Sequence, residues 1–569
     1  MSYAPPTAEQ AFVLRHVVEI DELAGHNRFA EATPDLVEAI VGGAGAFAAG
    51  TFAPLNRVGD RTGARWSADG VAMPPGFREA YRAYVEGGWG TLAGPPGHGG
   101  QGLPLTLATV VLEDLGSANM AFSLCPMLSA GAVEALTHHG SGELQSRYLP
   151  KLVSGEWTGT MNLTEPQAGS DVGALKTRAA PAADSTWSIE GQKIFITYGD
   201  HDLADNIVHL VLARTPGAPP GTKGISLFLV PKILPDGSRN DLRCVSIEHK
   251  LGIHASPTCV MSFGDEGRCT GWLIGEETGG MRAMFTMMNN ARLNVGLQGV
   301  SIAERATQAA AAFALQRIQG SRAGRPAAIA SHPDVRRMLL RMKALTQAAR
   351  ALAYYAAGQT DRASLGDSGA KARADLLTPL VKTYGTDVGV EVASLGVQIH
   401  GGMGYIEETG AAQHLRDIRI SPIYEGTNGI QAADLVVRKI GLEGGAVLER
   451  LLAEARADAT EPLAGLVDAV DEVVGWMAGA SVEDRLAGSY PLTTMFSVAV
   501  AGWLLERQDR AAAQMMADGE GDPRFLAMKR ASASYYRTAL VPEAAGLKAA
   551  AMAGADLLYA LDDDAFAAV

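Results

Sequence analysis

The chain has 569 residues, of which 47% are hydrophobic and 19% are charged, a balance that is ordinary for globular proteins. Its formal net charge of -14 argues against nucleic acid or an anionic membrane as the main partner, although it allows a locally basic site for a phosphorylated ligand. A chain of this length exceeds what one hydrophobic core supports, so we expect several domains.

Cysteine usage and the N-terminal sequence predict a soluble, cytoplasmic protein. The cysteines Cys125, Cys244, Cys259 and Cys269 form no Cys-x-x-Cys pair and lie in apolar surroundings, which is typical of reduced thiols. The N-terminus has no basic region followed by an apolar core, as a secretory signal would have. We expect no membrane span, because the best apolar run, 496–505, is far shorter than the roughly 18 residues required.

The first 156 residues are predicted to be helical. Apolar residues recur at helical spacing in several segments, namely 14–23, 36–52, 77–84, 107–115 and 145–153. A passage rich in glycine and proline, 94–104, interrupts them. We therefore expect an N-terminal helical extension over 1–35 and an N-terminal α-domain over 36–156.

The middle of the chain changes to short β-rich runs, which begin at about Trp157 and end at about Ile274. The clearest predicted strands are 208–213 and 224–230, and turn residues separate the runs. This pattern predicts an antiparallel sheet in a middle domain over 157–278.

Helical periodicity returns at 281–319 and continues to Ile440. The sequence Gly-Leu-Glu-Gly-Gly at 441–445 then predicts a helix stop and a linker. We expect a C-terminal α-domain over 279–440 and an appended helical domain over 446–569.

A single glutamate, Glu425, follows Tyr424 and precedes a Gly-Thr turn that opens a helical run. Such a turn can lift one carboxylate off an apolar surface, where desolvation raises its pKa from about 4.3 and suits it to act as a general base. The alternative is a glutamate that caps a helix or forms a salt bridge.

Two further segments could contact a flat polar ring. The segment 161–171 runs from a strand into an irregular loop with backbone donors, Thr164 and Ser170, which suits a ring edge or a phosphate; the alternative is a satisfied surface turn. In the strand 193–197, alternation places Phe195 and Thr197 on one face. An aromatic plane beside a hydroxyl suits the ring of a flavin, whereas the alternative is ordinary core packing.

Other motifs exclude several functions. The histidine pairs at 138–139 and 249–254 lack the partners of a zinc site, so we expect no metal. No hydrolase elbow, Walker loop or Gly-x-Gly-x-x-Gly strand-turn-helix unit occurs, which disfavours a serine hydrolase and a dinucleotide fold. Arg317 and the glycine-rich segment 398–404 can still bind a pyrophosphate.

In chain order, four motifs resemble those of the flavin-dependent acyl-CoA dehydrogenases, over residues of about 40 to 440. They are Thr-Glu-Pro-x-x-Gly-Ser-Asp at 164–171, aromatic-Ile-Thr at 195–197, Gln-Ile-His-Gly-Gly at 398–402 and Tyr-Glu-Gly-Thr at 424–427. The helical start and the domain beyond Gly441 further resemble the enlarged bacterial branch that includes the 3-methylmercaptopropionyl-CoA dehydrogenases. This resemblance implies an α+β fold: an N-terminal helical domain, a middle antiparallel β-domain, a C-terminal helical bundle and an appended helical domain.

The resemblance implies FAD as the cofactor, held between two subunits. The implied cofactor-binding residues are Met161, Leu163, Thr164, Ser170, Phe195, Ile196, Thr197, Arg317, Gln398, Gly401, Gly402 and Thr427. Those of the β-domain would face the flavin ring. Arg317, Gln398 and Gly402 would reach the pyrophosphate and adenosine of the neighbouring subunit's FAD.

The resemblance also implies the substrate-binding residues, which are Ser170, Asn289, Arg292, Tyr424 and Gly426.

Two departures from the family pattern matter. Phe195 stands where tryptophan is frequent, which keeps the stacking but loses the indole N–H. Some members place the base immediately before the arginine that corresponds to Arg292, but that neighbour is Ala291 here, so Glu425 is the only matching base.

The implied reaction is the FAD-dependent α,β-dehydrogenation of an acyl-CoA thioester to a trans-2-enoyl-CoA. Glu425 would take the α-proton while the β-hydride passes to the flavin. The resemblance implies electron-transfer flavoprotein as acceptor, and 3-methylmercaptopropionyl-CoA or a short or medium acyl-CoA as substrate, but it leaves the acyl group open.

Two alternatives remain at this stage: an acyl-CoA oxidase that returns electrons to oxygen, and a flavin-free scaffold whose C-terminal helices bind a partner or a membrane surface. The appended helices carry apolar stripes that require a partner surface, and the preceding helical domain is the nearest one. Since that surface forms the tetramer in ordinary members of the family, we expect a homodimer.

Overall fold

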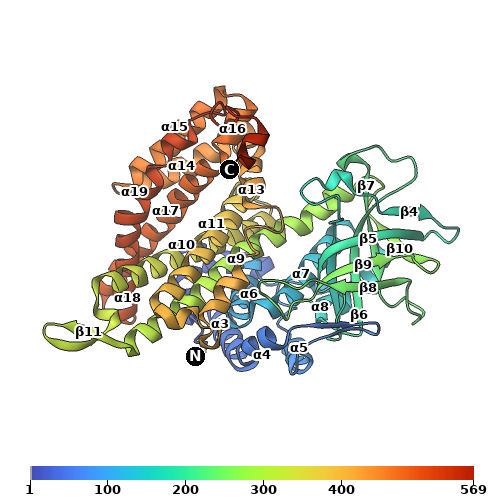
Figure 1. The fold of residues 1–569 in the computed structure, drawn as a ribbon, viewed down its shortest axis with the longest axis horizontal. Helices are drawn as coiled ribbons and strands as arrows, with labels where there is room; N and C mark the ends of the chain where they lie inside the picture. The colour runs from blue at the N-terminus through green and yellow to red at the C-terminus, as the bar shows by residue number, and fades with distance from the viewer. Residues whose placement is uncertain (1–2, 569) are drawn as a thin grey trace. The chain divides into compact units, whose positions relative to one another are not determined.

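In the computed structural model, which describes residues 3–568, the chain forms two compact units (Figure 1). The first unit contains Asn27–Asn294 together with the N-terminal residues up to Thr7. The second unit contains Ala8–His26 together with the residues from Val295 onward. The N-terminal helical segment therefore belongs with the C-terminal helices, although the two are far apart in the sequence.

The helices of the first unit follow the predicted order, with two helices, over 56–62 and 120–139, in addition to the predicted ones. They are α3 (Pro34–Phe47), α4 (Asn56–Thr62), α5 (Phe77–Glu86), α6 (Leu105–Ala118), α7 (Met120–His139) and α8 (Gly142–Ser154). Thr33 and Ser141 cap α3 and α8 by accepting a backbone N–H three residues on. The sequence analysis does not predict α7, because its buried side chains surround most of the helix and leave no apolar stripe.

Two helical segments of the described chain are long and apolar enough, by length and composition, to cross a membrane: Pro34–Thr62 and Met120–His139. This finding corrects the expectation that 496–505 is the best candidate. Of the most apolar window in Met120–His139, 83% is buried inside the protein, against 39% for Pro34–Thr62. Core helices of globular proteins meet the same criterion, so the two segments are weak support for a membrane span.

The large sheet of the first unit has eight strands among the described residues: β3 (Trp157–Asn162), β4 (Arg178–Pro181), β5 (Trp187–Thr197), β6 (Asn206–Arg214), β7 (Ile225–Pro231), β8 (Leu242–Ile247), β9 (Thr258–Phe263) and β10 (Cys269–Ile274). Their order is β10-β7-β6-β4-β5-β9-β8, and β10 also pairs with β5. A separate hairpin joins β1 (Arg65–Ser67) to β2 (Gly70–Ala72). The sheet is mainly antiparallel as predicted, but β3 runs parallel to β6, with Trp157 opposite Asn206.

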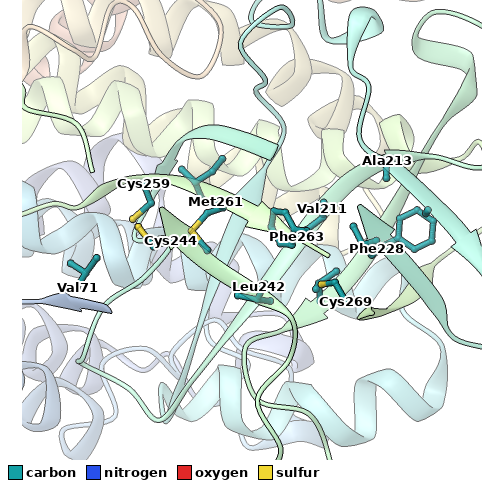
Figure 2. Close-up of a cluster of buried hydrophobic side chains, with 14 residues drawn as sticks. Val71, Val211, Ala213, Phe228, Leu242, Cys244, Cys259, Met261, Phe263 and Cys269 are labelled. Atoms are coloured by element: carbon teal, nitrogen blue, oxygen red, sulfur yellow. The ribbon is translucent and has the colours of Figure 1, made fainter. Parts of the chain in front are cut away.

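An apolar cluster fills the interior of the sheet (Figure 2). Phe228, Met261 and Phe263 pack there with Cys244, Cys259 and Cys269. All four cysteines are buried and free of disulfides, as expected. Burial raises the pKa of the Cys125 and Cys269 thiols, so these groups act as small apolar side chains.

The second unit is helical. Its helices before the linker are α1 (Thr7–Val13), α2 (Ile20–Ala24), α9 (Gly280–Gln316), α10 (Pro333–Ser364), α11 (Ser368–His400), α12 (Ala411–Ile418) and α13 (Asn428–Asp434); α9 begins in the first unit. A hairpin of β11 (Ile318–Arg322) and β12 (Arg325–Ala328) follows α9, where the sequence analysis expects helix to residue 319. Helix α9 ends at Gln316 because Gly320 and Gly324 adopt positive φ angles, of 71° and 77°, that favour the turns of a hairpin.

The linker after residue 440 stops the helix as predicted, because Glu443, Gly444 and Gly445 all adopt positive φ angles. The appended helices are α14 (Ala446–Asp458), α15 (Leu463–Gly479), α16 (Val482–Ala487), α17 (Ser489–Asp518), α18 (Pro523–Tyr535), α19 (Val541–Ala545) and α20 (Lys548–Ala551).

The appended helices pack against the helices that precede the linker, as the sequence analysis expects (Figure 1). Helix α17 contacts α10, α11 and α13. Tyr384 of α11 and Tyr536, just beyond α18, share a hydrogen bond of 2.7 Å between their hydroxyl oxygens. Arg341 of α10 donates two hydrogen bonds of 2.8 Å to the carboxylate of Glu543 in α19.

The N-terminal helices pack on the appended helices. Phe12 lies in an apolar cluster with Ala512 and Leu526. The ammonium group of Lys529, fully buried, donates to Glu9 at 2.7 Å. These contacts join the two ends of the chain within the second unit.

Candidate active site

The turn that carries Glu425 is held in an unusual backbone conformation. Glu425 has a φ of 55° and Gly426 has a φ of 80°, so both residues adopt left-handed conformations that cost free energy for a residue with a side chain. The backbone N–H of Asn428 donates to the carbonyl of Pro422 at 2.9 Å and closes the turn. Thr427 then caps α13 by accepting the N–H of Ile430 at 3.1 Å. Both the turn and the helix that follows it agree with the sequence prediction.

The N-terminal flank of this turn is attached to α9 through one amide. The side-chain oxygen of Gln298 accepts hydrogen bonds from the hydroxyls of Tyr424, at 2.5 Å, and Ser421, at 3.1 Å. Gln298 and Ser421 are buried. Burial raises the pKa of Tyr424, and the nearby charge of Glu425 contributes to the shift, so Tyr424 stays a neutral hydrogen-bond donor. The sequence analysis does not predict a role for Gln298.

The loop after β3 is anchored by a buried ion pair. The ammonium group of Lys193 lies 2.8 Å from the carboxylate of Glu165 and also donates to the carbonyl of Leu163 at 3.0 Å. The same carboxylate accepts from the hydroxyl of Thr177 at 2.6 Å and from the backbone N–H groups of Lys176 and Thr177. Burial alone would raise the pKa of Glu165, but Lys193 and these donors together lower it to about 2.

The same loop is joined to the strand that carries Phe195. The backbone N–H of Ile194 donates to the carbonyl of Thr164 at 2.9 Å. Next to this bond, the pairing of β5 with β9 shifts register between Lys193 and Ile196, and Phe195 adopts a φ of 59°. The bulge leaves the aromatic ring 58% exposed, whereas Ile196 is buried in the sheet core. An exposed phenylalanine on a rigid, bulged strand is an open stacking surface.

The other predicted residues of this loop and strand gather in the same part of the first unit. Thr164 and Thr197 are half-buried, and Ser170 is exposed in the loop. The side chains of Met161 and Ile196 are buried, so these residues can contact a ligand only through their backbone groups. The backbone bond between Ile194 and Thr164 therefore places the loop after β3 beside the strand that carries Phe195 and Thr197.

The second unit contains the predicted phosphate contacts. Arg317 lies exposed between α9 and β11, and its guanidinium donates to Gln319 at 3.4 Å. Gln398 is exposed near the end of α11. Gly401 has a φ of 59°, and a Cβ atom added to Gly401 or Gly402 would meet no atom within 4 Å, so the space beside both glycines is open.

The predicted substrate residues Asn289 and Arg292 lie three positions apart on α9, hence on one face of that helix. Asn289 is half-buried, and Arg292 is buried with its guanidinium 5.8 Å from the centre of the Phe285 ring. Ala291 is buried, and its methyl side chain cannot accept a proton.

The groups that hold these segments in place were not predicted from the sequence; they are Glu165, Lys193, Gln298 and Asn428. A charged residue inside an apolar strand, as Lys193 is, was the available signal, since a buried lysine requires a partner. The partner itself, 28 positions away, could not be identified without the fold.

Models of known protein families match nearly the whole chain. Those of the N-terminal, middle and C-terminal domains of acyl-CoA dehydrogenases match residues 42–156, 160–265 and 278–440. A model described as acetyl-CoA dehydrogenase C-terminal like matches residues 443–562.

Relatives extend the similarity over the appended domain. The 3-methylmercaptopropionyl-CoA dehydrogenase of Ruegeria pomeroyi is 44% identical, over 95% of this chain and 97% of the relative. A butyryl-CoA dehydrogenase of Syntrophomonas wolfei is 35% identical, over 87% and 88%. The fold resembles an acyl-CoA dehydrogenase of Bacillus anthracis, solved with FAD, with a TM-score of 0.75 and 22% identity over 95% of this chain and 90% of that one.

The relatives of this chain are named as dehydrogenases, which favours a dehydrogenase over the oxidase and scaffold alternatives. The matched models and the identity of 44% over 95% of the chain confirm the resemblance drawn from the sequence. The chain belongs to the acyl-CoA dehydrogenase family of FAD-dependent oxidoreductases.

Proposed function

We propose that Glu425 is the base that removes the α-proton of an acyl-CoA thioester. One observation carries this assignment: a single carboxylate lies on a turn with two consecutive left-handed residues, and hydrogen bonds hold both flanks of that turn. Strain of this kind persists only where the surrounding structure enforces it, and it is common at catalytic sites. Ala291 cannot replace the carboxylate as a base.

FAD fits the residues of the first unit. The exposed ring of Phe195 offers a stacking face, and the hydroxyls of Thr164 and Thr197 can hydrogen-bond a polar ring edge. The ion pair of Glu165 and Lys193 fixes the loop that carries Thr164. Met161, Leu163, Ser170 and Ile196 would contribute backbone groups or the loop hydroxyl.

The second unit offers contacts for the phosphates of FAD. The guanidinium of Arg317 can pair with a pyrophosphate oxygen, and the open space beside Gly401 and Gly402 allows close approach of the backbone. Gln398 and Thr427 carry side chains that can donate a hydrogen bond to the same group.

The reaction removes one proton and one hydride. The carboxylate of Glu425 takes the proton from the α-carbon, and the electron pair of that C–H bond forms the new double bond. The backbone N–H of Glu425 would stabilise the negative charge that develops on the thioester oxygen, an effect typically worth about 3–4 kcal/mol per donor. When bound, FAD supplies the acceptor for the hydride that leaves the β-carbon. The product is a trans-2-enoyl-CoA.

For the acyl group we propose 3-methylmercaptopropionyl-CoA, because the relative of that name is 44% identical to this chain over nearly its full length. The expected result is that this thioester reduces the enzyme's flavin faster than pentanoyl-CoA, which has the same chain length but a methylene in place of sulfur. Anaerobic bleaching of the flavin with both thioesters and butyryl-CoA is the measurement. Faster bleaching with pentanoyl-CoA or butyryl-CoA would contradict the assignment.

We propose electron-transfer flavoprotein as the electron acceptor and the cytoplasm as the location. The first rests on family membership, and the second rests on the four buried, reduced cysteines. Slow reoxidation of the reduced enzyme in air, and rapid reoxidation by electron-transfer flavoprotein, would support the acceptor. Rapid reoxidation in air would favour the oxidase alternative.

We also propose that the protein is a homodimer that shares two FAD sites. The appended helices cover faces of α10 and α11 that would otherwise remain available to a further pair of subunits. Light scattering of the intact protein should give a mass of about twice 59.5 kDa. A clean tetramer would contradict this role of the appended domain.

A further inference from the structure

A tyrosine of the appended domain is linked by two hydrogen bonds to the turn that carries Glu425. We propose that Tyr490 is a positioning residue, which acts through Asp387 and Asn428 to fix the placement of the Glu425 carboxylate. The inference rests on the proposed role of Glu425 as the base. It gives the appended domain a part in catalysis.

The first link joins the appended domain to α11. The hydroxyl of Tyr490, at the second position of α17, donates to one carboxylate oxygen of Asp387 at 2.7 Å. Burial raises the pKa of Asp387, and the donors Tyr490 and Asn428 oppose that shift. The carboxylate therefore depends on both donors to stay in one orientation.

The second link joins α11 to α13. The other carboxylate oxygen of Asp387 accepts from the side-chain amide of Asn428 at 2.8 Å. The fully buried ammonium of Lys382 donates to the amide oxygen of Asn428 at 2.8 Å, and the hydroxyl of Thr386 lies within hydrogen-bonding distance of the same amide. Asn428 is itself buried, so each of its polar atoms requires these partners.

The third step leads from Asn428 to the base. Asn428 is the first residue of α13 and lies three positions after Glu425. Its backbone N–H closes the turn on Pro422 at 2.9 Å, so the side chain and the backbone of one residue restrain the same turn. The other flank is held by Gln298 on α9, through Tyr424 and Ser421. The appended domain thus supports the C-terminal flank, and α9 supports the N-terminal flank.

Loss of the Tyr490 hydroxyl would leave Asp387 with one side-chain donor fewer, and the carboxylate could then turn away from Asn428. A small displacement of the base has a large effect on rate, because proton transfer requires close and aligned atoms. We therefore expect Tyr490→Phe to lower the rate of flavin reduction about tenfold, with little change in the substrate concentration for half-saturation. A larger kinetic isotope effect with α-deuterated substrate is expected as well, since proton removal becomes slower.

The chain offers a matched control in Tyr536→Phe. Tyr536 also belongs to the appended domain, and its hydroxyl also bonds to α11, through Tyr384 at 2.7 Å. Among the described residues, neither hydroxyl of this pair forms a hydrogen bond to Asn428 or to the turn, so loss of the pair should leave the rate and isotope effect unchanged. Both variants are measured as the full-length, FAD-loaded enzyme, together with their melting temperatures.

A slow Tyr490→Phe beside a normal Tyr536→Phe, at similar melting temperatures, would support the proposal. Normal rates in both variants, with an inactive Glu425→Gln, would overturn the positioning role and leave the base assignment intact. Equal slowing in both variants would also overturn it, because it would indicate a general loosening of the appended domain. Activity in Glu425→Gln would show that the base assignment itself is wrong, and the positioning role would fall with it.

If Tyr490→Phe does not fold, Asp387→Asn tests the same link between the appended domain and the turn that carries Glu425. Asn428 and Tyr490 donate to different oxygens of Asp387, and the substitution replaces one of these oxygens by an NH2 group, so one of the two donors loses its acceptor. The same slowing and the same increase in isotope effect are expected, and an unchanged rate would overturn the proposal.

Discussion

Replacing Glu425 by glutamine is expected to abolish turnover while FAD stays bound and the fold stays intact. Glutamine has nearly the same shape and can keep the left-handed turn, but it cannot accept the α-proton. Loss of a general base typically costs about 10²–10⁴-fold in rate. The residue that immediately precedes Arg292 in the sequence, Ala291, has no carboxylate that could take over the role.

The measurement is the steady-state rate with an acyl-CoA, together with the FAD content and the melting temperature. Glu443→Gln is a suitable control, since Glu443 is also a glutamate with a positive φ, of 51°, but lies exposed in the linker. Its activity should equal that of the wild type. If Glu425→Gln kept more than about a tenth of the wild-type activity, Glu425 would not be the base.

Replacing Lys193 by methionine is expected to destabilise the protein and to weaken FAD binding. The substitution keeps an unbranched side chain that is one atom shorter, but it leaves the carboxylate of Glu165 buried without its cation. Breaking a buried pair in this way typically costs about 3–5 kcal/mol of unfolding free energy. The loop would also lose the bond to the carbonyl of Leu163, next to Thr164, so FAD affinity should fall as well.

Urea unfolding and FAD titration measure the two effects of Lys193→Met. The control is Lys151→Met, which removes the exposed ion pair of Lys151 with Glu156 and should cost less than about 1 kcal/mol. Equal stability of the two variants would contradict the structural role of the buried pair.

The destabilisation by Lys193→Met should depend on pH. The folded pKa of Glu165 is about 2, below the 4.5 that is usual for a glutamate, so the ionised carboxylate contributes stability above about pH 4.5. That contribution is lost as the pH falls through about 2, where the folded protein also takes up the proton. The difference between the wild type and the variant should therefore shrink between these values.

Local patterns predicted the parts of the structure that depend on local sequence. The β-rich region expected between Trp157 and Ile274 agrees with the first and last strands of the large sheet, because strand alternation and turn residues are short-range signals. The turn at Glu425 was recognisable from its Gly-Thr sequence and the helix that follows. The apolar stripes of the appended helices correctly indicated a partner surface on α10 and α11.

Features that depend on tertiary contacts were not predictable in this way. The bulge at Phe195 places an aromatic residue at a φ of 59°, which no local propensity favours. The parallel pairing of β3 with β6 joins strands that are not consecutive in the sequence. The hydrogen bond from Tyr490 to Asp387 joins residues that are 103 positions apart, so the sequence near either residue does not identify its partner.

The central claim, that the enzyme removes an α-proton and a β-hydride from an acyl-CoA, is tested most directly by a single anaerobic turnover. The FAD-loaded enzyme is mixed with 3-methylmercaptopropionyl-CoA, in ordinary and α-deuterated form, and the flavin absorbance and the mass of the thioester are followed together. The account predicts flavin bleaching with a primary isotope effect and a thioester that has lost two hydrogen atoms, in equal amount to the reduced flavin. A flavin that stays oxidised with this thioester and with the other acyl-CoAs, or that bleaches without formation of the enoyl-CoA, would contradict it.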